Sequence, residues 1–318
     1  MLTRYQRILL IGRLSLRFIW RRRNILVRAT ACFIIGIVSL YFSKYQSFDW
    51  RFKLREVNHP STEIVLVDMS RRDWVGWEGL ELSQLVQLKE LESVPDSHYW
   101  NTQAWKTFLN NILIDNPTGV GVTFYFGTGL ADLSPEELSS PVFNDPKVFW
   151  ASRIDQEGRI LLPSFSRIYN NNIGLGDFKA DGDGIVRSFR SPLVQVPHLA
   201  IRLARLKVDE VNYITGDTQA INFQGPENTY TRVSFSDVVN QQVPKGFFTN
   251  KIVIVGTFDG EAHVLRTPLG PIARSEVIAN VIDTLIGKKS IQRVSLWICI
   301  LILLGLLVLC TLIISNFP

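Results

Sequence analysis

The chain has 318 residues, of which 46% are apolar and 20% are charged. This composition excludes a disordered or collagen-like chain, and three Cys are too few for a disulfide scaffold. The formal net charge of +5 is unevenly distributed, because residues 1–48 carry eight Arg and one Lys but no acid, while all 29 acids lie between residues 49 and 293. An excess of positive charge at one end, beside an apolar run, argues against nucleic-acid binding and favours a membrane.

The N-terminal region is predicted to contain a basic cytoplasmic segment followed by a membrane helix. Residues 1–24 hold seven of the eight Arg, so the positive-inside rule places them in the cytoplasm, either lying on anionic lipid headgroups or forming a solvated tail. Residues 25–44 are predicted to cross the membrane, since 29–43 are uncharged and Arg28 and Lys44 can extend toward the headgroups. A cleaved signal peptide is the alternative, but no small-x-small cleavage site follows the apolar run.

The C-terminal region is predicted to form a second membrane helix over residues 294–314. These 21 residues carry no charge and would cover about 31 Å as a helix, close to the thickness of a hydrocarbon core. A buried core helix is the alternative. Two membrane helices place residues 45–293 outside the cytoplasm and return residues 315–318 to it.

The outer region alternates strands and helices in a way that indicates an α/β domain. A strand, a helix and a strand between residues 63 and 126 indicate a crossover unit with parallel strands. We therefore predict a single extracytoplasmic α/β domain with a mixed, mainly parallel sheet and crossover helices, flanked by one transmembrane helix on each side. The predicted strands are 63–68, 118–126, 147–154, 159–162, 220–223 and 251–255, with a turn entering a strand over 182–190. The predicted helices are 82–91, 102–116, 198–206, 235–239 (capped by Ser234) and 274–286.

Motifs for catalysis and for metal or phosphate binding are not found. The four His are scattered without metal-ligand spacing. Residues 181–184 resemble the start of a calcium loop without its later oxygen ligands, which favours a turn stabilised by aspartates. Gly256 follows a predicted strand without the glycine spacing of a phosphate-binding loop, and no nucleophile elbow occurs. We expect no cofactor, no metal ion and no enzymatic activity.

Short segments along the outer region occur in a characteristic order. They are SFDWRFKLR (47–55), EIVLVDMS (63–70), NPTGVGVTFYF (116–126), DGDGIVRSF (181–189), INFQGPENTYTRVSFSDVV (221–239), FTNKIVIVG (248–256), TPLG (267–270) and EVIANVIDTLI (276–286). Together they resemble the CHASE domain of type 2, an extracytoplasmic sensory domain of bacterial signalling proteins. The resemblance spans about residues 48–290 and implies a protein of the bacterial inner membrane whose bulk is periplasmic. The chain departs from the family at Thr123, where an Asp is usual, and at 278–280, where His-Ala-Asn is usual.

Candidate functional residues lie in these segments and in the predicted membrane helices. The candidate ligand-binding residues are Asp68, Ser70, Asp183, Arg187 and Glu276. We expect Asp183 to shape its turn and Arg187 to pair with a nearby carboxylate, a structural role more than a ligand-binding one. A solvated strand residue is the alternative for Arg187. Small residues allow membrane helices to approach closely, so Gly36 and Gly305 are candidates for helix packing, with ordinary lipid-facing packing as the alternative.

Two functions from different classes are consistent with these features. The leading one is a membrane-anchored sensory or regulatory subunit, whose outer domain senses a ligand or partner and acts through another membrane protein. The alternative is a non-catalytic structural or assembly subunit of a bacterial envelope complex; an extracytoplasmic enzyme and a truncated gene are further alternatives. The expected partners are the lipid bilayer, with anionic headgroups at the N-terminal Arg cluster, and other membrane or envelope proteins or a second copy of the chain, but not nucleic acid.

Overall fold

The computed structural model describes much of the outer region and parts of both chain ends. The described residues are 30, 33–34, 36–38, 44–55, 60–69, 102–124, 140–155, 157–161, 172–191, 196–208, 211, 218–257, 264–288, 291 and 295–316. The chain divides into two compact units, one of residues 52–291 and the other of residues 1–51 with 292–318. The predicted helix 82–91 and the candidate Ser70 lie outside the described residues.

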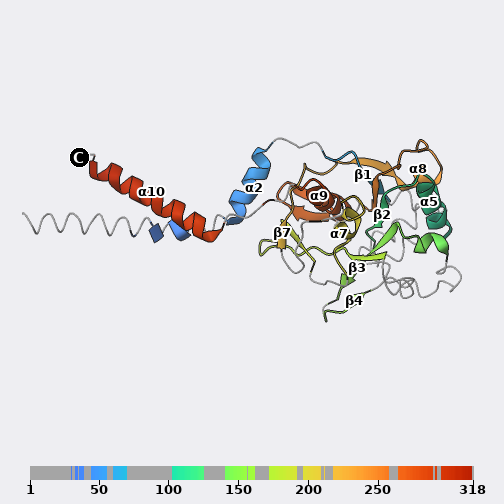
Figure 1. Cartoon of the computed structure of the whole chain (residues 1–318), viewed down its shortest axis with the longest axis horizontal. Coiled ribbons are helices and arrows are strands. Elements are labelled where there is room, and N and C mark those ends of the chain that lie inside the picture. The colour runs from blue at the N-terminus through green and yellow to red at the C-terminus, as the bar shows by residue number, and fades with distance from the viewer. Residues whose placement is uncertain are drawn as a thin grey trace, which may run out of the picture. The chain divides into compact units, whose positions relative to one another are not determined.

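A mainly parallel seven-stranded sheet forms the centre of the 52–291 unit (Figure 1). Its strands are β1 (Ile64–Asp68), β2 (Gly119–Val122), β3 (Val148–Ile154), β4 (Ile160–Leu161), β5 (Ile173–Leu175), β8 (Thr231–Ser234) and β9 (Ile252–Gly256). They run in the order β4-β3-β2-β9-β1-β8, and β5 also pairs with β3. β4 is antiparallel to β3, whereas the other pairings of the sheet are parallel. The predicted α/β class with a mixed, mainly parallel sheet is confirmed.

The described residues of this unit also form antiparallel pairs and helices around the sheet. The pairs are β6 (Ser188–Arg190) with β7 (Thr218–Ala220), and β10 (Val264–Thr267) with β11 (Gly270–Ala273). The helices are α5 (Thr102–Ile114), the 3₁₀ helix η3 (Pro141–Asn144), α7 (Leu199–Ala204), α8 (Phe235–Val239) and α9 (Arg274–Ile286). The predicted strand 220–223 overlaps the observed β7 only at Ala220, and the backbone N–H of Asn222 donates to the Thr284 side chain of α9 instead of to a strand.

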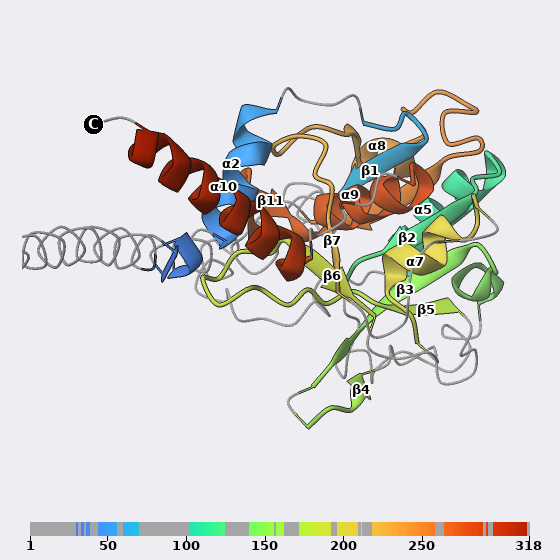
Figure 2. The same ribbon diagram turned by 60° about the vertical axis from the view of Figure 1, so that its left-hand side comes forward.

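Helices cover both faces of the sheet, so alternate strand residues are buried in different layers. Val65 and Val67 of β1 pack in one core with Trp105 of α5 and Phe235 of α8. On the opposite face, α9 packs on β1 and β9, and α7 packs on β2, β3 and β5. α5 and α8 lie side by side in both views (Figure 1, Figure 2). Burial on both faces explains why β1 and β9 are continuous apolar runs in the sequence.

α7 lies unusually close to the sheet because glycines face it. A Cβ atom added at Gly121 of β2 would lie 2.5 Å from Leu203 Cδ1, and one at Gly174 of β5 would lie 2.5 Å from Leu199 Cα. A side chain can shift away from such a contact, but the helix backbone cannot do so without moving α7. Glycine at Gly174 therefore fixes how closely the helix approaches the strand.

Side-chain caps begin α7 and α8. Ser234 Oγ accepts a hydrogen bond from the Ser236 N–H at 3.1 Å, which confirms the predicted cap of α8. His198 Nδ1 accepts a hydrogen bond from the Ala200 N–H at 3.2 Å and caps α7. Burial lowers the pKa of His198 to about 4, although hydrogen bonding to the backbone of Asp177 opposes this effect. His198 is therefore a neutral, buried cap.

The second unit contains α10 (Leu296–Asn316) and most of α2 (Lys44–Leu54). The two glycines predicted to pack membrane helices differ in their surroundings. A Cβ atom at Gly36 would lie 2.7 Å from Cδ1 of Leu303 in α10, whereas no described atom would lie within 4 Å of one at Gly305.

Throughout the described part of the chain, no helix combines the length and the apolarity that a membrane crossing needs. The membrane helices over residues 25–44 and 294–314 therefore stay predictions.

Candidate functional site

The carboxyl ends of parallel strands meet at one edge of the sheet. β1 ends at Asp68, and the register places this residue beside Ser234 at the end of β8 and Gly256 at the end of β9. Thr123 follows β2 at the same edge, where its Oγ1 donates to the carbonyl of Val255 at 3.0 Å. Ligands of open α/β sheets bind outside the carboxyl ends of the strands, which makes this edge the candidate site.

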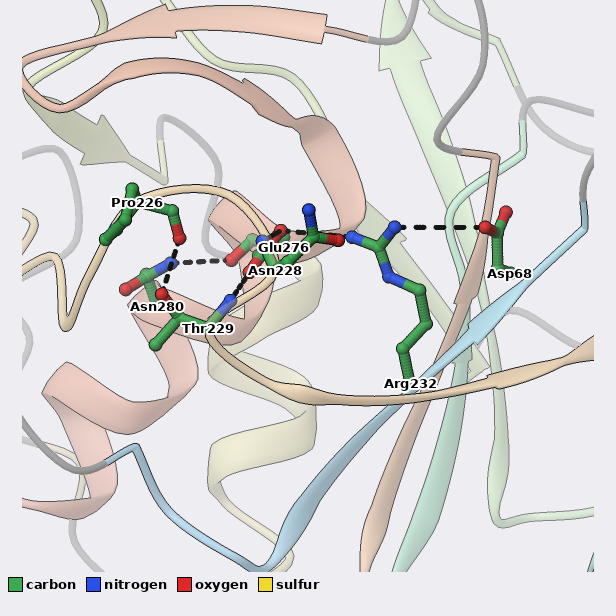
Figure 3. Close-up of polar contacts among 7 residues, drawn as sticks. All are labelled: Asp68, Pro226, Asn228, Thr229, Arg232, Glu276 and Asn280. Atoms are coloured by element: carbon green, nitrogen blue, oxygen red, sulfur yellow. Dashed lines mark hydrogen bonds and ion pairs between the residues drawn. The ribbon is translucent and has the colours of Figure 1, made fainter.

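Arg232 joins Asp68 and Glu276, two of the predicted candidates (Figure 3). The register pairs Arg232 with Leu66, two residues before Asp68, so both charged side chains lie on the face that α9 covers. Arg232 Nη2 donates to Glu276 Oε2 at 3.3 Å, whereas Arg232 Nη1 lies 3.9 Å from Asp68 Oδ2. The first contact is a hydrogen bond, and the second is a Coulombic attraction beyond hydrogen-bond distance. One guanidinium is thus shared between carboxylates of β1 and α9.

Glu276 is a fully buried acid in the first turn of α9. Its side chain is 0% exposed, compared with 22% for Asp68 and 23% for Arg232. Glu276 Oε1 accepts a hydrogen bond from the Thr229 N–H at 2.8 Å, and Oε2 accepts one from the Asn228 N–H at 3.2 Å. Burial raises the pKa of Glu276, while the two backbone donors and Arg232 oppose the rise. These partners compensate for the loss of water around a buried carboxylate.

Glu276 begins a row of polar side chains along one face of α9. Asn280 follows Glu276 by four residues, and Asp283 and Thr284 follow Asn280 by three and four residues, so all of them lie on the same side of the helix. Asn280 Oδ1 accepts a hydrogen bond from the Gln224 N–H at 2.8 Å, and Thr284 Oγ1 accepts one from the Asn222 N–H at 3.1 Å. The row therefore fastens residues 222–229, here called the fastened segment, to α9 through backbone N–H groups. The members of the row are Glu276, Asn280, Asp283 and Thr284.

Asp283 connects the same row to the residues just before β1. Its Oδ2 accepts hydrogen bonds from the Ser61 N–H at 3.1 Å and from the Tyr230 hydroxyl at 3.2 Å. Burial, and next the neighbouring Asp283, raise the pKa of Tyr230 well above its ordinary value. Tyr230 therefore stays a protonated donor to the carboxylate.

The other predicted pair, Asp183 and Arg187, lies in the turn before β6. Arg187 donates to Asp183 Oδ1 at 2.9 Å, to Asp183 Oδ2 at 2.6 Å and to Asp181 Oδ2 at 2.9 Å. Gly184 adopts a φ of +79° in this turn, a conformation that favours glycine. The hydrogen bond from Arg187 lowers the pKa of Asp183, and burial partly opposes that effect. The structure thus shows the carboxylate pairing and the turn expected from the sequence.

Sequence reasoning missed Arg232, the residue that brings Asp68 and Glu276 together. It lies on a strand that pairs with β1 across about 165 residues of chain, and no local pattern records such a pairing. The polar row of α9 did leave a signal, because its polar residues recur at helical spacing in an otherwise apolar helix.

The arrangement at the sheet edge suits binding more than bond cleavage. Asp68 and Arg232 are each about one fifth exposed, so an acceptor and several donors stand side by side where a polar ligand could contact them. Among the described residues, no group of three or more His, Cys, Asp and Glu side chains could hold a metal ion.

The fold and the site define an α/β domain with helices on both faces of a mainly parallel sheet and a charged cluster at the carboxyl ends of its strands. A family model described as CHASE2 domain matches residues 27–314. The chain therefore belongs to the CHASE2 domain family, and the resemblance noted in the sequence is confirmed. CHASE2 domains are extracytoplasmic sensory domains of signalling proteins and are generally non-catalytic. No curated protein and no solved structure matches the chain.

Proposed function

We propose that the chain is a membrane-anchored, non-catalytic sensory subunit whose outer domain binds a small polar ligand around Asp68. The observation that carries this proposal is the partly exposed pair of Asp68 and Arg232 at the carboxyl edge of the sheet. Parallel α/β sheets bind ligands at this edge, and the family is a sensory one. A partly exposed carboxylate beside a partly exposed guanidinium offers hydrogen bonds and ion pairing to a ligand that carries charge of either sign.

We further propose that the sensed state reaches another membrane protein through the predicted membrane helices. α2 follows the predicted helix 25–44 in the chain, and α9 precedes the predicted helix 294–314. A ligand that favours one arrangement of these elements would shift the relative placement of the membrane helices, the two-state element that such coupling needs. This proposal places the protein in the bacterial inner membrane with residues 45–293 outside the cytoplasm.

Thermal unfolding of the purified full chain in detergent tests the ligand proposal. The probes are panels of anionic, cationic and zwitterionic small molecules at millimolar concentration. We expect at least one compound to raise Tm, because a ligand that binds the folded state stabilises it by mass action. The shift should disappear in Asp68→Ala and persist in Asp183→Ala, which removes an ion-paired carboxylate from a different turn. No shift with any panel, or a shift that survives Asp68→Ala, would contradict the proposal.

Topology and partnership need separate tests. A membrane-impermeant thiol reagent applied to spheroplasts should label a cysteine introduced at Gln241, which is exposed, and spare one at Arg4. The reverse pattern would overturn the proposed orientation.

Purification of the full chain in mild detergent should recover a second membrane protein whose association with it responds to the ligand. Fixed-stoichiometry recovery of envelope proteins, without any ligand effect, would favour a structural subunit instead.

A further inference from the structure

Arg232 lies between two carboxylates, and both compete for its guanidinium. Its guanidinium lies 3.3 Å from Glu276 and 3.9 Å from Asp68, so both acids attract one cation. The contact to Asp68 is the looser and the more exposed of the two. Neutralising Asp68 would remove the pull toward β1, so that of these two acids Glu276 would be the one that still attracts the guanidinium.

A stronger contact between Arg232 and Glu276 would change the strength of the hydrogen bonds that Glu276 accepts. Arg232 favours the ionised form of Glu276, while burial opposes it. Ionised carboxylates accept stronger hydrogen bonds than neutral ones. The bonds concerned are those from the backbone N–H groups of Asn228 and Thr229, at the end of the fastened segment. Charge at Asp68 is therefore linked to how tightly this end of the segment is held on α9.

The opposite end of the fastened segment contacts the residues that follow α2. Arg55, the residue after α2, donates to Asn222 Oδ1 at 2.6 Å and also to the carbonyl of Phe223. Phe52 of α2 packs edge-on against the Phe223 ring, with centroids 5.8 Å apart. The fastened segment thus contacts α9 along the length of the segment, and it contacts α2 at the start of the segment. These helices are the two elements that lead toward the predicted membrane helices.

From these contacts we propose that Arg232 is a positioning residue that passes a change of charge at Asp68 to Glu276, and so sets how tightly residues 222–229 are fastened to α9. The inference rests on the proposed function for its biological role, because a ligand at Asp68 would supply the change of charge. Its test needs no ligand. Failure of the relay and failure of ligand binding are therefore distinguishable.

Amide hydrogen exchange of the full chain in detergent, followed by mass spectrometry with residue-level fragmentation, measures the fastening directly. Asp68→Asn removes the charge with little change of shape. We expect it to slow exchange at Asn228 and Thr229 by roughly two- to fivefold, the size expected for a partly exposed ion pair. Glu276→Gln should speed exchange at these residues, because one amide oxygen replaces two carboxylate oxygens. The Asn222 amide, bonded to Thr284 at the far end of the segment, should respond less.

Variants of Arg232 decide whether the guanidinium carries the effect. In an Arg232→Gln background, Asp68→Asn should no longer slow exchange at Asn228 and Thr229. Arg232→Lys keeps the charge but lacks the forked guanidinium, so the response should shrink there too; this variant serves if Arg232→Gln does not fold. Glu157→Gln, which neutralises an acid of the exposed pair with Arg159, should leave these amides unchanged.

Two outcomes would overturn the relay. One is unchanged exchange at Asn228 and Thr229 in Asp68→Asn. The other is an equal slowing with and without Arg232, which would mean that the two carboxylates act on each other directly. A slowing that requires Arg232 supports the relay, even if no ligand in the panels binds.

Discussion

The side chain of Arg187 is 4% exposed, whereas that of Asp183, which it contacts through both terminal nitrogens, is 37% exposed. A buried guanidinium therefore depends on a carboxylate at the protein surface, four residues before it in the chain. The arrangement is sensitive to substitution because a buried cation without its partner is costly.

Replacing Asp183 should destabilise the domain more than replacing an ordinary surface acid. Asp183→Ala leaves the Arg187 guanidinium with Asp181 as its remaining acid from this turn, and we expect a loss of about 1–3 kcal/mol in the free energy of unfolding. Chemical denaturation measures this loss. Glu157→Gln, which removes an acid from an exposed pair with Arg159, is the control and should change stability by less than about 0.5 kcal/mol. Equal effects of the two variants would contradict the structural role.

The same pair predicts a pH dependence at acid pH. Because the pKa of Asp183 is lowered in the folded state, its contribution is present above the ordinary carboxyl pKa and is lost as pH falls through the lower, folded value. The stability difference between wild type and Asp183→Asn should therefore be constant near neutral pH and should shrink below about pH 4. A difference that stays constant in strong acid would show that the charge is not involved.

His198 should destabilise the fold in mild acid. The pKa of His198 is about 4 in the folded state, below the ordinary value of 6.5. Between these two pH values the unfolded chain binds a proton at this residue that the folded domain does not bind. Stability falls as pH drops from 6.5 toward 4, by roughly 3 kcal/mol in total. His198→Asn keeps a good helix cap and removes the titration, so its unfolding free energy should vary less over that range. An unaltered pH profile in this variant would refute the assignment.

A methyl group at Gly174 should destabilise the domain far more than one at Gly182. The first would lie 2.5 Å from the Cα atom of Leu199, whereas no described atom would lie within 4 Å of the second. We expect Gly174→Ala to cost about 1–3 kcal/mol and Gly182→Ala to cost less than about 0.5 kcal/mol, as judged by denaturant midpoints. Similar midpoints for both variants would mean that α7 can move away from β5 freely.

Gly36 and Gly305 should also respond differently to a larger side chain. Leucine at Gly36 would displace Leu303 of α10, whereas leucine at Gly305 meets open space among the described atoms. Spin labels at Ile34 and Ile302, both exposed, report the distance between these helical segments. Gly36→Leu should broaden or lengthen that distance, and Gly305→Leu should leave it unchanged. A change with Gly305→Leu alone would reverse our assignment of the packing glycine.

Short sequence patterns predicted the strands, helix bounds and helix cap that depend on residues close together in the chain. The apolar runs of β1 and β9 showed strands buried on both faces, and the bounds of α9 were found at Arg274 and Ile286. Ser234 was recognisable as a cap because its hydroxyl precedes a short apolar helix. Such features depend on neighbours within a few residues, which the sequence displays directly.

Pairings between distant segments were not predictable in the same way. β8 is four residues long and lies beside β1 through a register that no local feature sets. The contact of Arg232 with Asp68 and Glu276 follows from that register and from the position of α9. Of the candidate site, the acids could thus be named from the sequence, but the cation between them could not.

The strand order has a consequence for how the domain folds. β1 pairs on both sides with strands from the far end of the domain, and Ile64 meets Ile252 about 190 residues later in the chain. β1 and β2 are separated by β9, so the crossover unit at the start of the domain cannot close its sheet by itself. Closing so long a loop is entropically costly, and topologies rich in distant contacts fold slowly. During synthesis, the edges of β1, with their unpaired N–H and C=O groups, stay unpaired until β9, the last strand of the sheet, has been made, and β1 is prone to aggregation until then.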